Sequence, residues 1–119
     1  MKLYGVYHAN RGVWGELSYG IGKLMGIRHC PLCDITHGVL SKKKQYKYCK
    51  TQLPVPMRDL YLNEQPAALK IFTSKQTPCV VLEKESLFTM AMTANELEDC
   101  QGNVALFHEK ISAFLKKHL

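Results

Sequence analysis

The spacing of apolar and polar residues divides the chain into strand-like and helix-like stretches. Residues 2–8 alternate apolar and polar side chains and are rich in β-forming residues, which predicts a first strand. Apolar residues at helical spacing predict one helix over residues 14–25 and another over residues 103–119, where Asn103 can cap the start. Both periods in one chain are typical of a mixed α/β domain.

Shorter elements are expected between these stretches. Pro31 suits the first turn of a helix, and we expect this helix to continue into a lysine-rich stretch before Pro54 and Pro56 end it. A strand, a short helix, a buried strand and a strand that pairs back with it as a hairpin are predicted, in that order, at residues 57–62, 65–72, 80–82 and 87–92. Residues 83–86 are predicted to form the turn of this hairpin.

The composition fits one globular domain. The chain has 119 residues, of which 46% are hydrophobic and 22% are charged. One core can therefore form, whereas two separate domains would each be small. We expect residues 1–119 to fold as a single domain.

The sequence gives no sign of export or of membrane insertion. No uncharged apolar run approaches the ~18 residues of a membrane span, and the first residues lack the apolar stretch of a secretory signal. The expected compartment is the cytoplasm, where thiols are kept reduced. The five cysteines therefore point to redox chemistry or metal binding rather than to a disulfide framework.

Positive charge is concentrated in one segment. The formal net charge is +6, and much of the excess lies in residues 42–50, where tyrosines interrupt a run of lysines. Such a segment can track a phosphate backbone and stack bases, but most lysine runs are solvated helix faces. Nucleic-acid binding is therefore disfavoured. A non-enzymatic adaptor that binds an anionic partner through Lys42 to Lys50 stays open as an alternative function.

The Cys-x-x-Cys motif at Cys30 and Cys33 carries the most specific chemistry in the sequence. Two thiols at this spacing can close a small disulfide ring, and a helix N-terminus stabilises the thiolate of the first one. His29, when protonated, would act in the same direction. The motif predicts that Cys30 attacks a disulfide and that Cys33 resolves the mixed disulfide. Metal binding and an idle pair of thiols are the alternatives.

The order of elements around this motif resembles the thioredoxin-like fold. A strand, the Cys-x-x-Cys helix, a strand, a helix, a hairpin and a C-terminal helix follow one another, and Thr77-Pro78-Cys79 precedes the buried strand. The resemblance implies an α/β three-layer sandwich, in which a central mixed sheet carries helices on both faces. Residues 11–29 would be a loop and helix inserted before the motif. Pro78 would begin the third strand through a cis peptide bond and face the cysteine pair.

This resemblance implies a thiol–disulfide oxidoreductase that needs no bound cofactor. Cys30 and Cys33 would be its catalytic residues, whereas His29, Thr77 and Pro78 would contact the substrate. The substrates would be disulfides in proteins or in small molecules.

Zinc binding is the main alternative. Cys30, Cys33 and His37 offer two thiolates and an imidazole, ligands that zinc binds tetrahedrally. The fourth ligand is open, with candidates at His8, His29, Cys49 and Cys79. No second half-site with regular spacing follows, so the pattern is incomplete. On this interpretation the chain is a structural or interaction module.

Residues 7–38 carry a second resemblance. Their Cys-x-x-Cys-Asp-Ile-Thr-His-Gly segment is similar to a family of small uncharacterised bacterial proteins, some of which carry a GTPase label. A phosphate-binding loop needs the pattern G-x-x-x-x-G-K-[ST], and here Ile21 follows Gly20 where the lysine belongs. The residues therefore give nucleotide hydrolysis no support.

The remaining candidates have simpler interpretations. Cys100 lies in a polar segment and is expected to be an idle surface thiol, whereas Cys79 is expected to be a small buried apolar residue. His8, His108 and His118 have no evident partners in the sequence.

Overall fold

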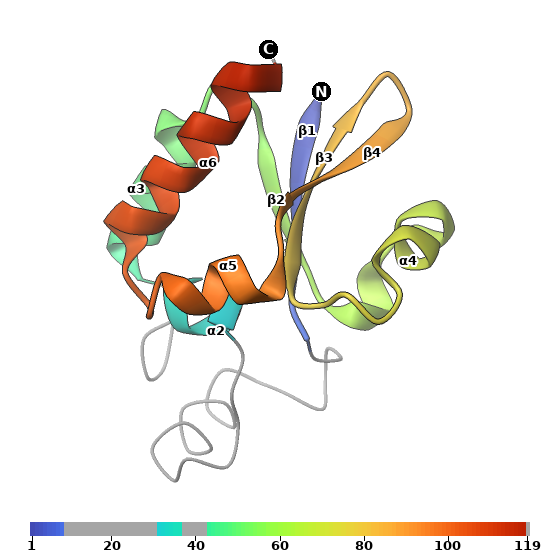
Figure 1. The fold of residues 1–119 in the computed structure, drawn as a ribbon, viewed down its shortest axis with the longest axis horizontal. Coiled ribbons are helices and arrows are strands. Elements are labelled where there is room, and N and C mark those ends of the chain that lie inside the picture. Colours follow the sequence, from blue (N-terminus) through green and yellow to red (C-terminus); the bar gives the residue numbers. More distant parts are fainter. Residues whose placement is uncertain (9–30, 37–42, 119) are drawn as a thin grey trace, which may run out of the picture.

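A four-stranded mixed sheet forms the centre of the protein (Figure 1). The computed structural model describes residues 1–8, 31–36 and 43–118. The strands β1, β2, β3 and β4 have the bounds Lys2–Val6, Met57–Leu60, Cys79–Lys84 and Leu87–Met92. Their order in the sheet is β2–β1–β3–β4; β1 and β2 are parallel, and the other two pairs are antiparallel. The α/β class and the four predicted strands are confirmed.

Helices lie against both faces of the sheet. α3 (Lys44–Gln52) and α6 (Val104–His118) lie on one side, whereas α4 (Ala67–Thr73) lies on the other (Figure 1). α2 (Pro31–Thr36) and α5 (Ala94–Asp99) contact each other at one end of the sheet, on the side of α6. A short 3-10 helix, η1 (Leu62–Glu64), follows β2.

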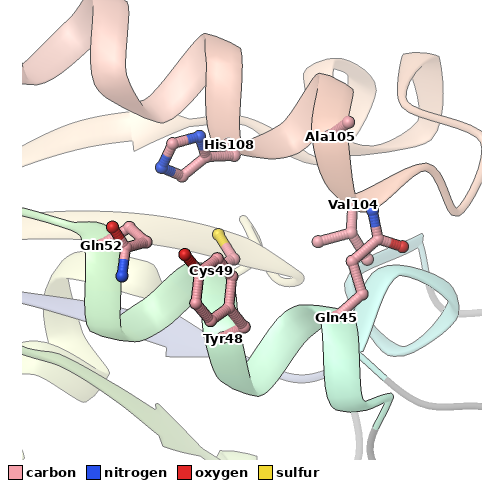
Figure 2. A pocket seen from close by; sticks show the side chains of 7 residues that line it. All are labelled: Gln45, Tyr48, Cys49, Gln52, Val104, Ala105 and His108. Carbon is pink, nitrogen blue, oxygen red and sulfur yellow. The ribbon is translucent and has the colours of Figure 1, made fainter.

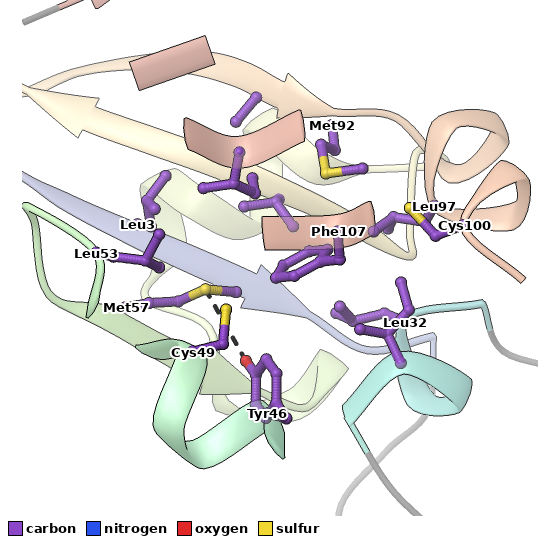
Figure 3. Packing of buried hydrophobic residues seen from close by; sticks show 14 of the residues in the cluster. Leu3, Leu32, Tyr46, Cys49, Leu53, Met57, Met92, Leu97, Cys100 and Phe107 are labelled. Atoms are coloured by element: carbon purple, nitrogen blue, oxygen red, sulfur yellow. Dashed lines mark hydrogen bonds between the residues drawn. The ribbon is translucent and has the colours of Figure 1, made fainter. Parts of the chain in front are cut away.

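Two apolar clusters fill the spaces between these layers. The larger one, which we call the α6-side core, includes Leu3 and Leu82 from the sheet and Phe107 from α6 (Figure 3). The smaller one, the α4-side core, includes Tyr4 and Val81. Neighbouring residues of β1 and β3 thus point to opposite cores, and both faces are covered. This explains why these strands are apolar almost throughout.

One expected element is wrong. The single helix from Pro31 into the lysine-rich stretch is two helices, because α2 ends at Thr36 and α3 begins at Lys44. Lys43 precedes α3 with an extended backbone (φ −65°, ψ 137°), and its N–H donates to the Thr36 carbonyl at 2.9 Å. A residue with extended torsions cannot continue the helical hydrogen-bond ladder.

The C-terminal helix is confirmed and a neighbouring helix is new. The Asn103 carboxamide oxygen accepts from the Leu106 N–H at 3.0 Å and so caps α6, as predicted. α5, which the apolar periodicity did not predict, begins with a capping box: the Thr93 N–H donates to the Glu96 carboxylate at 3.0 Å, and the Glu96 N–H donates to Thr93 Oγ1 at 3.3 Å. The helix expected at 14–25 and the insertion at 11–29 lie outside the described residues.

Candidate functional site

Cys33 lies on α2, with its side chain fully buried in the α6-side core. Leu32 and Ile35 of the same short helix are buried in the same core, so apolar contacts of these side chains hold α2. The other half of the motif, Cys30, lies outside the described residues, as do His29 and His37. Of the predicted catalytic pair, the structure therefore describes Cys33.

The end of β1 holds α2 in place. Tyr7, directly after β1, shares a hydrogen bond of 3.1 Å with Thr36 Oγ1, and both side chains are buried. The Tyr7 ring also packs against Tyr61, with ring centroids 5.1 Å apart. Burial, followed by the negative charge of Asp59, raises the pKa of Tyr7 far above its ordinary value. The phenol therefore keeps its proton and stays a hydrogen-bonding anchor for α2.

His8, the residue after Tyr7, is hydrogen-bonded to the segment that precedes β3. His8 Nδ1 and Thr77 Oγ1 are 2.8 Å apart in a hydrogen bond. The Thr77–Pro78 peptide bond is cis, as the resemblance implied, and Pro78 is buried. Val6 of β1 stands opposite Cys79 of β3 in the antiparallel register. Consecutive residues at the end of β1 thus connect to the Cys33 helix and to the segment that was expected to contact substrate.

A buried carboxylate lies on β2, beside β1. Asp59 has a side chain that is only 3% exposed; its Oδ2 lies 3.0 Å from Lys50 Nζ, and its Oδ1 accepts from the Tyr46 hydroxyl at 2.5 Å. Burial, and then the charge of Asp59, raises the pKa of Tyr46 well above its ordinary value. Asp59 therefore accepts from a phenol that stays protonated, and this ties α3 to β2.

Gly5 makes room for this carboxylate. It pairs with Asp59 in the parallel register of β1 and β2. A methyl group at Gly5 would lie 2.9 Å from Met57 Cε and 3.3 Å from Asp59 Oδ1. The glycine thus allows the Asp59 carboxylate to lie against β1.

The remaining described cysteines are separate from the expected site. Cys79 is fully buried in the α4-side core, on the other face of the sheet from Cys33, and burial raises its pKa to about 12. It is the small buried residue expected from the sequence. Cys49 is 5% exposed on α3, and burial also raises the pKa of its thiol. Cys100, expected at the surface, is instead 1% exposed, because its turn packs between α5 and α6 into the α6-side core.

No zinc centre is assembled by the described residues. Within residues 1–8, 31–36 and 43–118, no three His, Cys, Asp or Glu side chains converge to hold a metal ion. Two of the three expected ligands, Cys30 and His37, lie outside these ranges, so zinc binding at the motif stays a prediction. Among the possible fourth ligands, His8 is hydrogen-bonded to Thr77 and Cys79 faces the α4-side core.

Sequence reasoning did not identify the two contacts at the end of β1. From the sequence, Tyr7 was interpreted only as part of the first strand, and Thr36 only as part of the segment that contains the Cys-x-x-Cys motif. Neither contact has a local signal, because Tyr7 meets Thr36 across 29 positions and His8 meets Thr77 across 69. His118 also has a partner, the Phe114 carbonyl at 2.9 Å.

None of the helices within the described ranges has the length and apolar character that crossing a membrane requires. No protein-family model, curated protein or solved structure matches this chain.

Proposed function

We propose that this protein is a thioredoxin-like domain that acts as a thiol–disulfide oxidoreductase, with Cys30 as the attacking thiol and Cys33 as the resolving thiol. The observation that carries the proposal is at the end of β1. There Tyr7 bonds to the helix that contains Cys33, and His8 bonds to Thr77 beside the cis-Pro78 bond. The thiol helix and the expected substrate segment are therefore hydrogen-bonded to two consecutive residues that directly follow β1.

The sheet gives the proposal its second support. The order β2–β1–β3–β4, with one parallel pair followed by an antiparallel hairpin, and helices against both faces, are compatible with the thioredoxin-like arrangement. The start of α2 at Pro31, the residue that follows Cys30 in the sequence, also supports the proposal.

The burial of Cys33 suits a resolving thiol. A resolving thiol has to reach the neighbouring cysteine of its own motif and does not have to meet the substrate. Full burial of Cys33 therefore leaves Cys30 as the thiol that encounters substrate. His29 would favour the Cys30 thiolate, and Thr77 and Pro78 would contact the substrate chain.

The proposed reaction transfers two electrons to a substrate disulfide. The Cys30 thiolate attacks one substrate sulfur, the substrate S–S bond breaks, and one substrate thiolate leaves and takes a proton from water. The Cys33 thiol loses its proton and attacks the Cys30 sulfur, which releases the second substrate thiol. The Cys30–Cys33 disulfide is formed and the substrate disulfide is reduced. We propose protein or small-molecule disulfides as substrates and the cytoplasm as the compartment.

A single-turnover measurement tests the assignment of both thiols. The reduced protein is mixed with a small aromatic disulfide whose released thiolate absorbs visible light. The wild-type chain should release two thiolates per molecule. Cys30→Ser should release none above background, and Cys33→Ser should release one and keep the other as an adduct on Cys30. Cys100→Ala, which removes a buried thiol that is not part of the motif, should behave as wild type.

Other results would favour the alternatives. One zinc per chain, with no thiolate release until a chelator is added, would replace the oxidoreductase with a zinc module. A metal-free protein in which Cys30→Ser changes nothing would leave the adaptor that binds an anionic partner through its lysines.

A further inference from the structure

The strand β4 lies at one edge of the sheet, and its side away from β3 pairs with no other strand of the described chain (Figure 1). Among the described residues, those of β4 make no backbone hydrogen bond beyond the β3–β4 ladder. A free edge presents a row of N–H and C=O groups to any extended chain that reaches it. The register shift in the ladder falls between Val80 and Val81, so the pairing is regular from Leu87 to Met90.

β4 lacks the charged residues and prolines that usually protect an edge strand. Its sequence, Leu-Phe-Thr-Met-Ala-Met, contains neither. The strand at the opposite edge, β2, carries Arg58 and Asp59 instead. A charge on an edge strand discourages pairing because the added strand would desolvate it, and a proline removes a ladder hydrogen bond. Of the two edges, β4 is therefore the one that favours the addition of another strand.

Apolar side chains of β4 are left in contact with water. Leu87 is 71% exposed. Phe88 and Met90 are only partly buried at the rim of the α4-side core, where the Phe88 ring packs against Phe72 with ring centroids 5.6 Å apart. A strand that paired with the free edge of β4 would cover part of this apolar surface, which favours association.

We infer that β4 pairs with β4 of a second copy of this chain, antiparallel and about a two-fold axis at Thr89. In this register the two Thr89 side chains lie opposite each other. Phe88 of each copy lies opposite Met90 of the other, and Leu87 lies opposite Ala91. All of these residues belong to β4, so the pairing does not extend into the hairpin turn.

The alternation of side chains selects this register. Opposite residues in an antiparallel pair point to the same face of the sheet, so the axis has to pass through a residue and not between two. Thr89 pairs with Leu82 of the α6-side core and points to that side, whereas Phe88 and Met90 pack against the α4-side core. An axis at Thr89 therefore brings threonine to threonine on one face and apolar side chains together on the other.

The pairing is self-complementary, as a two-fold interface requires. Every residue in it is uncharged, so no like charges meet across the axis. A cross-strand threonine pair is stabilising, and a methionine sulfur packs favourably at an aromatic ring. The two sheets would become one continuous sheet, with the two α4-side cores adjoining at Phe88 and Met90. The thiol chemistry proposed above does not depend on this interface.

Sedimentation over a range of protein concentrations tests the pairing through charges placed at the axis. The wild-type chain should show a reversible equilibrium between monomer and dimer. Thr89→Lys and Thr89→Glu each bring two like charges together and should raise the dissociation constant about fivefold or more at low salt. An equal mixture of the two variants should associate at least as tightly as wild type, because lysine then lies opposite glutamate. Thr89 is exposed, so both variants should fold.

A control variant separates β4 from another exposed surface. A groove between α3 and α6 is lined by Tyr48, Val104 and the exposed Gln45, among others (Figure 2). Gln45→Lys adds the same charge in this groove and should keep the wild-type dissociation constant.

Three results would overturn the proposal. A wild-type chain that stays monomeric up to about 1 mM would be too weakly associated for a specific dimer. An unchanged dissociation constant in Thr89→Lys would mean that the copies meet through another surface. A mixture of Thr89→Lys and Thr89→Glu that associates no more tightly than each variant alone would exclude the axis at Thr89.

Discussion

At the scale of single residues, the Asp59 carboxylate connects two side chains of α3 to β2. It accepts from the buried Tyr46 hydroxyl and pairs with Lys50. Breaking a buried pair by removing one partner costs more than the pair contributes, because the other partner stays desolvated. Lys50 is 26% exposed and can turn toward water, which lowers that cost. The Tyr46 hydroxyl cannot turn toward water, since its side chain is fully buried.

Asp59→Asn is therefore expected to destabilise the protein. The substitution removes the charge that Lys50 and Tyr46 both meet, and the free energy of unfolding should fall by about 2 kcal/mol. Urea denaturation measures this change. Asp99→Asn, an exposed position on α5, should stay within about 0.5 kcal/mol of wild type. An Asp59→Asn protein as stable as the control would show that the pair contributes nothing.

The buried Cys79 thiol gives a pH-dependent prediction. Its pKa is raised from an ordinary value of 9.0 to about 12. Above about pH 9 the unfolded chain loses this proton while the folded chain keeps it. Rising pH therefore lowers the free energy of the unfolded state relative to that of the folded state. The contribution of Cys79 to the free energy of unfolding is complete below pH 9 and falls as the pH rises toward 12.

Cys79→Val should remove this dependence. Valine keeps an apolar side chain at a site that does not need the thiol, so the decline in stability between pH 9 and 10 should be shallower in the variant than in wild type. Thermal unfolding across that range measures it. The same slope in both proteins would mean that Cys79 ionises in the folded state as readily as in the unfolded chain.

At the scale of elements, the hairpin turn between β3 and β4 is strained by its residues. Glu85 and Ser86 have φ values of 53° and 65°, the left-handed region that a two-residue turn with φ positive at both positions requires. Asparagine and glycine adopt this region at lower cost than glutamate and serine.

Replacing both residues should stabilise the hairpin. Glu85→Asn combined with Ser86→Gly is expected to raise the free energy of unfolding by about 1 kcal/mol, and the melting temperature by about 4 °C. Calorimetry provides the measurement. Ser112→Gly in the middle of α6 should have the opposite sign, because glycine weakens a helix interior. A double variant that melts at or below wild type would contradict this account of the turn.

Local patterns predicted most of the elements. The strand at β1 and the long helix α6 have clear periods, and Asn103 caps α6 as expected. α5 was predictable from the Thr-x-x-Glu capping pattern that starts at Thr93, but it is too short for its apolar period to be distinctive. The break before α3 was not predictable, because it depends on the backbone torsions of Lys43.

The candidate site was predictable only in part. The Cys-x-x-Cys pattern and the proline before β3 are local features of the sequence, and both can be found without a structure. The contacts of Tyr7 with Thr36 and of His8 with Thr77 depend on which strands become neighbours. The burial of Cys100 depends in the same way on how α5 and α6 pack, so its polar sequence neighbours gave the wrong expectation.

At the scale of the whole molecule, the two cores divide the cysteines between separate environments. Cys33 belongs to the α6-side core together with α2, whereas Cys79 belongs to the α4-side core across the sheet. The sheet therefore separates Cys33 from Cys79. Cys33 is therefore expected to form a disulfide with Cys30 and not with Cys79.

Equilibration in glutathione buffers, followed by peptide mass spectrometry, tests the central claim most directly. Two thiols should disappear together as the buffer becomes more oxidising, one cross-linked peptide should join Cys30 to Cys33, and reduction should restore both thiols. Cys30→Ser should lose this transition, whereas Cys79→Val should keep it. A pair that stays reduced in every buffer, or a cross-link from Cys33 to a cysteine other than Cys30, would contradict the proposed oxidoreductase.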